Sequence, residues 1–282
     1  MTTPKPVPPP ASPERRLTDD LTVVIPVRNA EALLDGCLRS VLACRPAAVV
    51  VVDGLSTDRT LKMLQDYPVT VLSDEGRGLP AARLLGARAA STSLVALVDV
   101  DVVLPDEDSL EALAREFLAG GFVGLQAAQE SVAGNGYWGR ALVDHHRTGR
   151  SRQWFGLVCT VFRRDELLEH GFDAQFVSGE DIELRWRLHA AGARLGVSTR
   201  TRVQHRYAGD DFVFARDQFL MDGRGLGRMV RQQRLRGTGL ALLPAAAAIR
   251  GIGLCVGRGK PQFIPYFVIF ALYNYLGMLG LR

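Results

Sequence analysis

Asp99 and Asp101 are two carboxylates that bracket a single residue and follow the apolar run 94–98. A short apolar run of this kind is typical of a buried strand, so we expect both side chains at the point where the strand ends. Carboxylate oxygens are the ligands that hard divalent cations such as Mg²⁺ or Mn²⁺ prefer, and phosphate oxygens and water fill the remaining positions. The pair therefore predicts a metal and phosphate site. A solvated turn is the alternative, because this spacing is common by chance.

Polar side chains also follow the earlier β-branched runs 21–27 and 48–52. Asn29 comes after the first run and Asp53 directly after the second. Ligands of open parallel sheets bind beyond the carboxyl ends of the strands, where these residues are expected. Asp53 could accept hydrogen bonds from a base or from ribose hydroxyls; alternatively, it closes a turn with the Ser-Thr-Asp segment that follows. The candidate residues around the end of the first strand are Pro26, Arg28 and Asn29.

Glu180 and Asp181 follow Gly179 and open the helical pattern 182–190. A carboxylate at a helix N-terminus is stabilised as the anion, and the anion is the form that accepts a proton from a hydroxyl group. The two acids therefore suggest a general base. The alternative is that they only cap the helix and complement its dipole.

Strand and helix patterns alternate through the first hundred residues, which predicts an α/β fold with right-handed crossovers and an open, mostly parallel sheet. The predicted strands cover 21–27, 48–52, 69–72 and 94–98, and the predicted helices cover 31–43, the segment after Asp58, and 79–90. The less regular second half has predicted strands at 122–127, 156–162 and 195–203 and a helix at 182–190. The polar residues of the first half should thus share one edge of the sheet.

Four segments, taken in order, resemble the nucleotide-binding half of the family-2 glycosyltransferases, which have the GT-A fold. They are IPVRNAEALLDGCLRSV, VVVVDGLSTDRT, SDEGRGLPAARLLGARAA and LVDVDVVLP, and they lie within residues 21–105. The resemblance implies a metal-dependent, inverting transferase of the hexosyltransferase type. Its donor would be a nucleotide-diphosphate sugar, its cofactor Mg²⁺ or Mn²⁺, and its acceptor a hydroxyl group.

The resemblance also implies roles for individual residues. Asp53 would contact the base or ribose of the donor. Asp99 and Asp101 would form the metal and nucleotide site, with Asp101 favoured as the direct ligand. Asp181 would be the catalytic base, and His205 resembles a histidine that lies near the metal in related enzymes.

Several arginines are candidates for binding phosphate. Arg77 and Arg83 match the segment that the related enzymes place near the nucleotide, where either could contact the diphosphate; an exposed helix arginine is the alternative for both. Arg224, Arg228 and Arg231 fall on one helical face and could bind the donor diphosphate, a lipid phosphate or lipid head groups. A solvated basic face is the alternative for these three.

The chain divides into three predicted parts: a disordered, proline-rich tail at 1–20, a catalytic domain at 21–211, and a basic, apolar helical extension at 212–282. The catalytic domain comprises a nucleotide-binding half at 21–105 and an acceptor half at 106–211. The extension holds ten Lys or Arg residues against two acids, a net charge of +8, whereas the rest of the chain carries −4. A basic and apolar end suggests an anionic membrane surface as a partner.

The stretch 263–281 has nineteen residues without a charge, which is borderline for a bilayer span of about 20 residues. The alternative is a pair of helices packed on the catalytic domain. We expect a cytoplasmic protein, peripheral or C-terminally anchored at the membrane, whose acceptor is a lipid-linked or cell-envelope glycan or a small molecule. The four cysteines form no paired motif and are expected as free thiols. A nucleic-acid partner is not expected, because no aromatic and basic binding motif accompanies the charge.

Other protein classes fit the sequence less well. A nucleotide-binding dehydrogenase needs GxGxxG after the first strand, where this chain has Arg28-Asn29-Ala30-Glu31. A sugar-nucleotide pyrophosphorylase shares the sheet, but no glycine-rich basic loop follows the first strand. A non-catalytic sugar-nucleotide-binding or membrane scaffold protein of the same fold is the alternative from a different class.

Overall fold

The computed structural model describes residues 15–132, 134–148, 155–173, 175–176, 179–206 and 209–281. Within these residues, eight strands form one sheet in the order β3-β2-β1-β4-β7-β6-β8-β5. The strands are β1 (Leu21–Val27), β2 (Ala48–Asp53), β3 (Thr70–Ser73), β4 (Leu94–Val98), β5 (Val102–Val103), β6 (Gly124–Val132), β7 (Cys159–Arg163) and β8 (Leu195–Arg206).

The first four strands are parallel, and the second half of the sheet is mixed. β1 pairs with β2 and with β4 in parallel, and β2 pairs with β3 in the same way. β7 then runs antiparallel to both β4 and β6, β8 runs parallel to β6, and the short β5 pairs antiparallel with the end of β8. The carboxyl ends of β1 to β4 therefore share one edge, as the sequence predicts.

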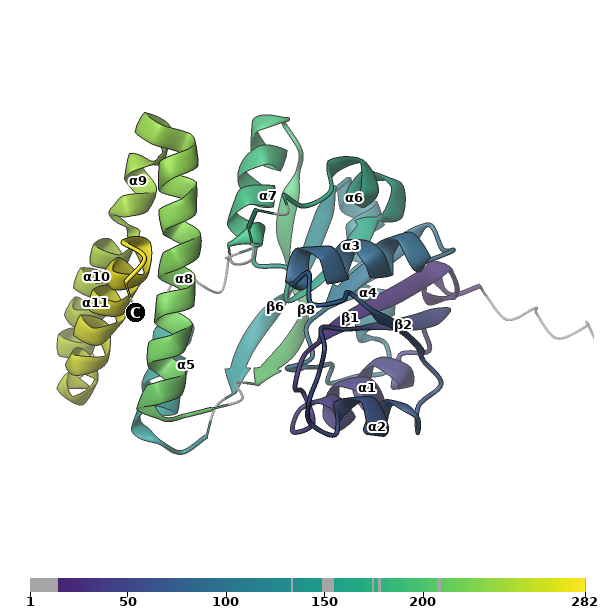
Figure 1. Cartoon of the computed structure of the whole chain (residues 1–282), viewed down its shortest axis with the longest axis horizontal. Helices are drawn as coiled ribbons and strands as arrows, with labels where there is room; N and C mark the ends of the chain where they lie inside the picture. The colour runs from purple at the N-terminus through teal and green to yellow at the C-terminus, as the bar shows by residue number, and fades with distance from the viewer. Residues whose placement is uncertain are drawn as a thin grey trace, which may run out of the picture.

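Helices cover both faces of the sheet (Figure 1). On one face α1 and α4 bury an apolar cluster that includes Val23 and Ile25 of β1. On the other face α3, α6 and α7 pack over Val24 and Val50. Because both faces of β1 and β2 are covered, their sequences are continuous apolar runs instead of alternating patterns. The helices so far are α1 (Leu34–Ala43), α2 (Thr60–Leu64), α3 (Leu79–Ala89), α4 (Ser109–Gly120), α6 (Arg164–His170) and α7 (Glu180–Ala190).

The remaining helices form a separate packed layer beside the sheet (Figure 1). They share a third apolar cluster, in which Phe219, Tyr266 and Phe267 are fully or almost fully buried. This layer joins α5, from the middle of the chain, to the C-terminal helices. Its members are α5 (Tyr137–Thr148), α8 (Phe212–Gln233), α9 (Thr238–Ala241), α10 (Leu243–Gly257) and α11 (Ile264–Met278).

Glycines let α8 and α11 touch through their backbones. A side chain on Gly223 of α8 would collide with the backbone of Asn274, and one on Gly277 of α11 would collide with the carbonyl oxygen of Leu220. Gly251 of α10 likewise leaves room for the ring of Phe267. The helical layer is therefore held in a close arrangement that depends on positions without side chains.

The structure confirms the α/β class and the first four predicted strands, each to within one residue. The helix predicted from residue 31 begins at Leu34, and the strand predicted at 122–127 runs over Gly124–Val132. The predicted tail at 1–20 meets the described residues only from Arg15, and its end is ordered: Leu17–Asp20 forms a 3-10 turn whose Thr18 N–H donates to Glu111. All four cysteines are free and buried.

Within the part of the chain that the structure describes, no helix combines the length and apolarity that a bilayer crossing requires. The stretch predicted as borderline contains α11, which has 15 residues.

Gly277→Ala should destabilise the protein by about 1–3 kcal/mol, because the added methyl group forces α11 away from the carbonyl oxygen of Leu220. Gly253→Ala is the matched control, since a side chain at that position of α10 meets no atom within 4 Å. The control should be neutral or stabilising, because alanine is the better helix former by about 1 kcal/mol. The measurement is the free energy of unfolding in urea, and equal effects at the two positions would contradict the backbone contact.

Candidate active site

Arg83 of α3 is the cation around which the acidic residues gather. Its side chain is 2% exposed, and its guanidinium donates to Asp99 (Nη2···Oδ1 2.7 Å) and to Glu180 (Nη1···Oε1 2.6 Å). Asp99 directly follows β4, and Glu180 is the first residue of α7. Arg83 therefore ties the edge of the sheet to the helix that carries Asp181. The alternative of an exposed helix arginine is wrong for this residue.

Burial shifts the protonation of this cluster. It raises the pKa of Asp99, and the charge of Asp101 adds to that shift while Arg83 opposes it. It also raises the pKa of Glu180, again against the effect of Arg83. For Arg83 itself, burial alone would lower the pKa of the guanidinium, but the charges of Asp99 and Glu180 raise it. The buried guanidinium of Arg83 thus pairs with the carboxylates of both Asp99 and Glu180.

Asp101 and His205 form a second pair beside the first. Val102 of β5 lies opposite His205 in the antiparallel ladder with β8, and the Arg206 N–H donates to the Asp101 carbonyl oxygen at 2.8 Å. This register places His205 Nε2 3.0 Å from Asp101 Oδ2. Burial alone would lower the pKa of His205, whereas the Asp101 carboxylate raises it above its ordinary value. The prediction that His205 lies beside the acidic pair is consistent with this contact.

The donor atoms of this second pair fit a divalent cation. Asp101 Oδ1 is buried and has no hydrogen-bond partner among the described residues, so a carboxylate oxygen is available as a ligand. Carboxylate oxygen and imidazole nitrogen both occur as ligands of Mn²⁺ and related ions. Within the described ranges, no group of three or more His, Cys, Asp or Glu side chains could hold a metal ion by itself. Phosphate oxygens or water would therefore have to complete the coordination.

The loops after β1 and β2 are joined by hydrogen bonds at the same edge of the sheet. Asn29 accepts from the Thr57 N–H at 2.8 Å through its side chain, and its own N–H donates to Ser56 Oγ at 2.9 Å. Asp53 is 3% exposed and accepts from the N–H groups of Leu55 at 3.1 Å and Ser56 at 3.2 Å. The turn expected as the alternative for Asp53 is thus present. Its contact with a donor stays a prediction.

The other residues predicted for donor binding differ in exposure. Arg28 is exposed after β1, and Arg77 is exposed in the loop after β3, where its Nε donates to the Asp74 carbonyl oxygen at 2.9 Å. Pro26 is buried within β1. The structure therefore leaves two arginines accessible at this edge, and the roles of all three residues toward a donor stay predictions.

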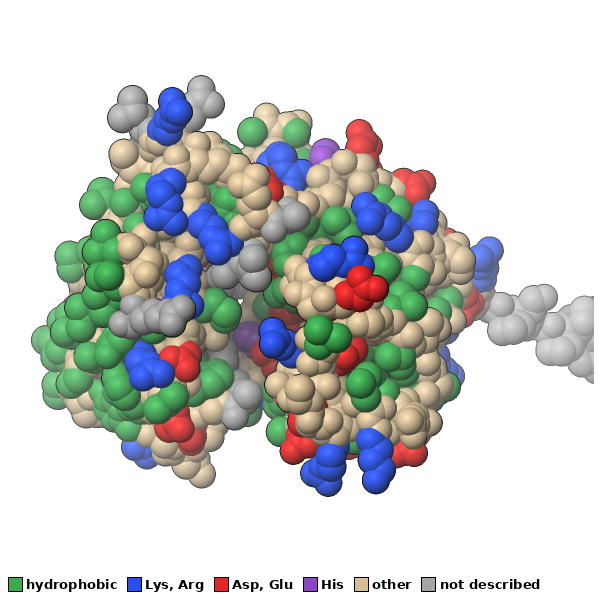
Figure 2. Space-filling model, in the orientation of Figure 1, with side chains coloured by type: hydrophobic (Ala, Val, Ile, Leu, Met, Phe, Trp, Pro, Cys, Tyr) green, Lys and Arg blue, Asp and Glu red, His purple; other side chains and the backbone are tan. Residues whose placement is uncertain are grey.

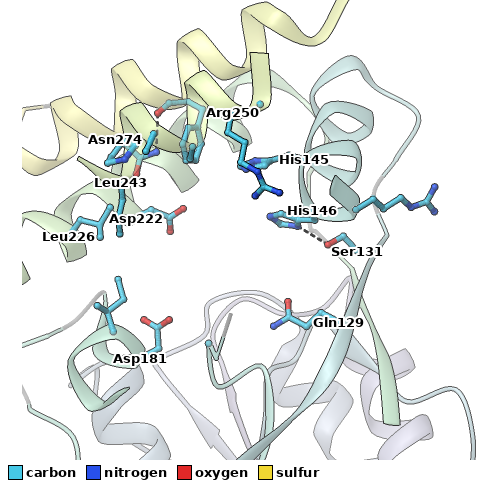
Figure 3. Close-up of a pocket in the computed structure, with 18 of the residues that line it drawn as sticks. Gln129, Ser131, His145, His146, Asp181, Asp222, Leu226, Leu243, Arg250 and Asn274 are labelled. Carbon is cyan, nitrogen blue, oxygen red and sulfur yellow. Dashed lines mark hydrogen bonds between the residues drawn. The ribbon is translucent and has the colours of Figure 1, made fainter. Parts of the chain in front are cut away.

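Asp181, in the first turn of α7, lines a cavity of about 610 Å³ between the sheet and the helical layer (Figure 3). Gly179 precedes the helix with a φ of 82°, and a side chain there would meet the backbone of Gly225 in α8. The left-handed φ and the close approach both require glycine. The start of α7 is thereby held against α8, and Asp222 of α8 faces Asp181 at the same side of the cavity (Figure 3).

Asp222 is a site residue that the sequence analysis missed. Its side chain is accessible from the cavity, and the protein around it raises its pKa to about 7; the charge of Asp181 adds to the effect of burial, and a hydrogen bond from Gln218 opposes it. The available signal was one of two acids, Asp217 and Asp222, that lie between Arg216 and Arg224 on one helix. An acid in a basic, solvated helix face needs no cavity, so the sequence alone did not single it out.

The described part of the chain thus brings the predicted residues together along one edge of the sheet, as ion-paired residues with Asp181 beside them and as neighbouring loops. Arg83, Asp99, Asp101 and His205 form two ion pairs that begin at the end of β4. Asp181 lies next to Glu180 at the border between these pairs and the cavity. The loops with Asn29, Asp53 and Arg77 form the neighbouring part of the same sheet edge.

Comparison with known proteins assigns the chain to a family. The family model described as Glycosyl transferase family 2 matches residues 22–165, about half of the chain. The chain belongs to glycosyl transferase family 2. This membership confirms the resemblance noted in the four sequence segments, and it sets aside the pyrophosphorylase alternative.

The family match covers Asp53, Asp99 and Asp101 but ends before Glu180, Asp181 and His205. In the structure, the Arg83 bridge places Glu180 and the adjacent Asp181 near Asp99. The pairing of β5 with β8 places His205 beside Asp101.

Two curated relatives share 32% identity with this chain. The pre-mycofactocin glycosyltransferase of Mycobacterium tuberculosis matches over 217 residues, which is 70% of this chain and 44% of the relative. The 4,4'-diaponeurosporenoate glycosyltransferase of Staphylococcus aureus matches over 116 residues, which is 39% of this chain and 31% of the relative. The chain therefore spans less than half the length of these curated relatives.

A solved mannosyltransferase, PcManGT from Pyrobaculum calidifontis in complex with GDP-Man and Mn²⁺, has the same fold. Its TM-score is 0.60 at 19% identity, and the superposition covers 90% of this chain and 86% of the mannosyltransferase. At this identity the likeness concerns the fold alone. The family-2 chain thus has the GT-A fold with C-terminal helices added to it.

Arg83→Gln should lower the free energy of unfolding by about 3–5 kcal/mol, because it leaves the buried carboxylate of Glu180 and the partly buried carboxylate of Asp99 without their cation. Arg45→Gln is the matched control: the Arg45–Glu107 pair is 69% exposed on both sides, and such surface pairs contribute about 0–1 kcal/mol. Urea unfolding of both variants measures the difference. A loss no larger than that of the control would show that the Arg83 bridge does not stabilise the fold.

Proposed function

We propose that this family-2 protein transfers a sugar, with inversion, from a nucleotide-diphosphate sugar to an acceptor hydroxyl. The observation that carries the proposal is the bridge of Arg83 between Asp99, at the donor edge of the sheet, and Glu180, next to Asp181. The bridge fixes the predicted phosphate site and the predicted base relative to each other. A transferase needs this proximity, because both substrates react at one carbon atom.

A divalent cation, Mg²⁺ or Mn²⁺, held by Asp101 with His205 and Asp99 nearby, would offset the negative charge of the diphosphate. The buried, unpartnered Asp101 Oδ1 supports this assignment. Asp53 and Asn29 hold the loops after β1 and β2 in the arrangement that would receive the base and ribose. Arg28 and Arg77 are exposed at the same edge and are available to the diphosphate.

In the proposed reaction the acceptor oxygen attacks the anomeric carbon from the face opposite the diphosphate. The bond between that carbon and the diphosphate oxygen breaks, and its electron pair leaves with the nucleoside diphosphate. Asp181 takes the proton of the acceptor hydroxyl. Because the attack and the departure occur on opposite faces, the configuration at the anomeric carbon inverts.

Relatives support the donor, the cation and the class of acceptor. The structural neighbour holds GDP-Man and Mn²⁺. The curated relatives are named for pre-mycofactocin and for 4,4'-diaponeurosporenoate. We extend these features to this chain as proposals: a hexose donor, a divalent cation, and a lipid-linked, cell-envelope or small-molecule acceptor.

The proposal includes contact with an anionic membrane surface at the cytoplasmic face. Leu242, Ile249 and Val256 recur every seven residues and are 66%, 72% and 65% exposed, which places them on one face of α10. Val268, Leu272 and Leu279 are exposed at helical spacing around α11. Figure 2 shows hydrophobic side chains along the outer edge of this layer, with Lys and Arg beside them. An apolar face flanked by basic residues is typical of helices that lie in the membrane interface.

Asp181→Asn should lower the rate of transfer at least about 100-fold, because it removes the group that accepts the proton. Binding of the donor should be unchanged. Asp101→Asn should instead weaken binding of the nucleotide sugar in Mn²⁺ by about tenfold, since it removes a ligand of the cation. Release of UDP or GDP measures turnover, and calorimetry measures donor binding.

Asp217→Asn is the control for these variants, since Asp217 pairs with its exposed neighbour Arg216 on α8. Near-full transfer by the Asp181 variant would overturn the assignment of the base. Donor binding by the wild-type protein without turnover, across a broad panel of donors and acceptors, would support the scaffold alternative.

The wild-type protein should sediment with phosphatidylcholine vesicles that contain phosphatidylserine and less with vesicles that lack it, because the apolar helices carry a positive charge. The pair of substitutions Ile249→Ser and Leu279→Ser should weaken this binding at least about tenfold, because two large apolar side chains are lost. Leu61→Ser with Val71→Ser is the control pair, exposed at 44% and 42% on the catalytic part. Equal binding by the two double variants would contradict the membrane face.

A further inference from the structure

The cavity beside Asp181 has two walls of different chemistry. One wall comes from β6, α5 and the start of α7, and the other from α8, α10 and α11. Its volume of about 610 Å³ is within the range of sites for small organic ligands, about 300–1,000 Å³. A sugar donor at the sheet edge would leave this space for the acceptor, because Asp181 lines it.

The wall formed by α10 and α11 is largely apolar, with Arg250 and Asn274 as its polar residues. Pro244, Ala246, Ala247 and Leu254 of α10 and Phe270 of α11 contribute to it. The small side chains at 246 and 247 leave room that larger residues would fill. A polyhydroxylated acceptor would lose hydrogen bonds to water against this wall without replacing them. An apolar body gains from the same contact.

Charge is separated along the cavity. Asp181 and Asp222 lie at one side, and the guanidinium of Arg250 extends from α10 into the cavity on the other side, near His145 and His146 (Figure 3). Burial lowers the pKa of His145 to about 4, with the charge of Arg250 adding to the shift, and burial lowers the pKa of His146 to about 3, with His145 adding to it. Both imidazoles are therefore neutral at pH 7.

Arg250 thus brings a positive charge into the cavity, whose lining also includes the charged residues Arg147 and Glu130. A guanidinium directed into a partly enclosed space binds carboxylates and phosphates through charge-assisted hydrogen bonds.

We propose that this cavity binds acceptors that have an apolar body and an anionic group in addition to the hydroxyl that receives the sugar. The apolar body lies against α10 and α11, the anionic group pairs with Arg250, and the hydroxyl lies at Asp181. This inference rests on the proposed transferase function, because it describes the second substrate of the same site.

Decyl phosphate, below its critical micelle concentration, is the probe for this site, and decan-1-ol is the uncharged probe of the same chain length. Calorimetry should show that Arg250→Gln weakens binding of decyl phosphate about tenfold and changes binding of decan-1-ol less than twofold. Arg250→Lys, which keeps the charge, should retain most of the affinity for decyl phosphate. Arg45→Gln, at an exposed position outside the cavity lining, should bind both probes as the wild type does.

Ala247→Trp should weaken both probes at least tenfold by filling the cavity. Val256→Trp, at an exposed position of the same helix, should leave the binding of both probes unchanged. Unchanged binding of decyl phosphate by Arg250→Gln, unchanged binding of both probes by Ala247→Trp, or no binding by the wild-type protein would each overturn the inference. The comparison with Val256→Trp also separates the cavity from the exposed apolar face of the same helices.

Hydrolysis of the nucleotide sugar by the same samples separates this inference from the proposed function. Arg45→Gln should hydrolyse the donor at the wild-type rate, because Arg45 is exposed and lies outside the cavity lining. Binding of decyl phosphate through Arg250 without any donor turnover in the wild-type protein would count against the transferase and still support the cavity assignment. Donor turnover together with probe binding that is unchanged in Arg250→Gln and Ala247→Trp would support the transferase and count against the cavity assignment.

Discussion

A single buried guanidinium, that of Arg83, links the sheet edge proposed for the donor to the helix that borders the cavity proposed for the acceptor. Its two hydrogen bonds connect Asp99, which follows β4, with Glu180, which begins α7 about eighty residues later. The buried carboxylate of Glu180 would be costly to keep charged without this cation, because a buried unpaired charge is unfavourable. Arginine suits the role because it keeps its charge when buried and its planar fork fixes the distance between two acceptors.

The helical layer completes the site through positions that have no side chain. Gly179 contacts Gly225 of α8, which sets where α7 begins, while Gly223 and Gly277 bring α8 and α11 into backbone contact. Any larger residue at these positions would move the layer away from Asp181 and widen the cavity. The chemistry of this cavity wall therefore comes from α10 and α11, but its distance from Asp181 also depends on Gly179 and on the glycines of α8 and α11. The binding and the catalytic parts of the site are coupled by packing.

Much of the donor half was predictable because its signals are local. Apolar runs covered on both faces identify β1, β2 and β4, and a strand that ends in Asp99 and Asp101 must place them at the sheet edge. Contacts between distant segments left no such signal: the burial of Arg83 depends on Glu180, and the place of His205 depends on its pairing with the two-residue β5. The helix α5 was missed because its sequence is mostly polar, with Ala141 and Leu142 as its fully packed residues. An apolar pattern on all sides, as in α11, fits a buried helix and a membrane helix equally well.

The charges of the site connect the binding of the cation to the binding of the donor. Asp99, Asp101 and Glu180 together carry more negative charge than Arg83 offsets, and the proton that Asp101 favours on His205 offsets part of the remainder. A nucleoside diphosphate brings further negative charge to this edge, so its approach is opposed unless a cation lies between it and Asp101. A divalent ion there would attract both the carboxylate and the phosphates, and each would strengthen the binding of the other. The exposed Arg28 and Arg77 reduce the repulsion but lie on the loops after β1 and β3. Without a cation, Asp99 and Asp101 therefore oppose the binding of phosphate. With a divalent cation between them and the phosphates, the same two carboxylates would favour it.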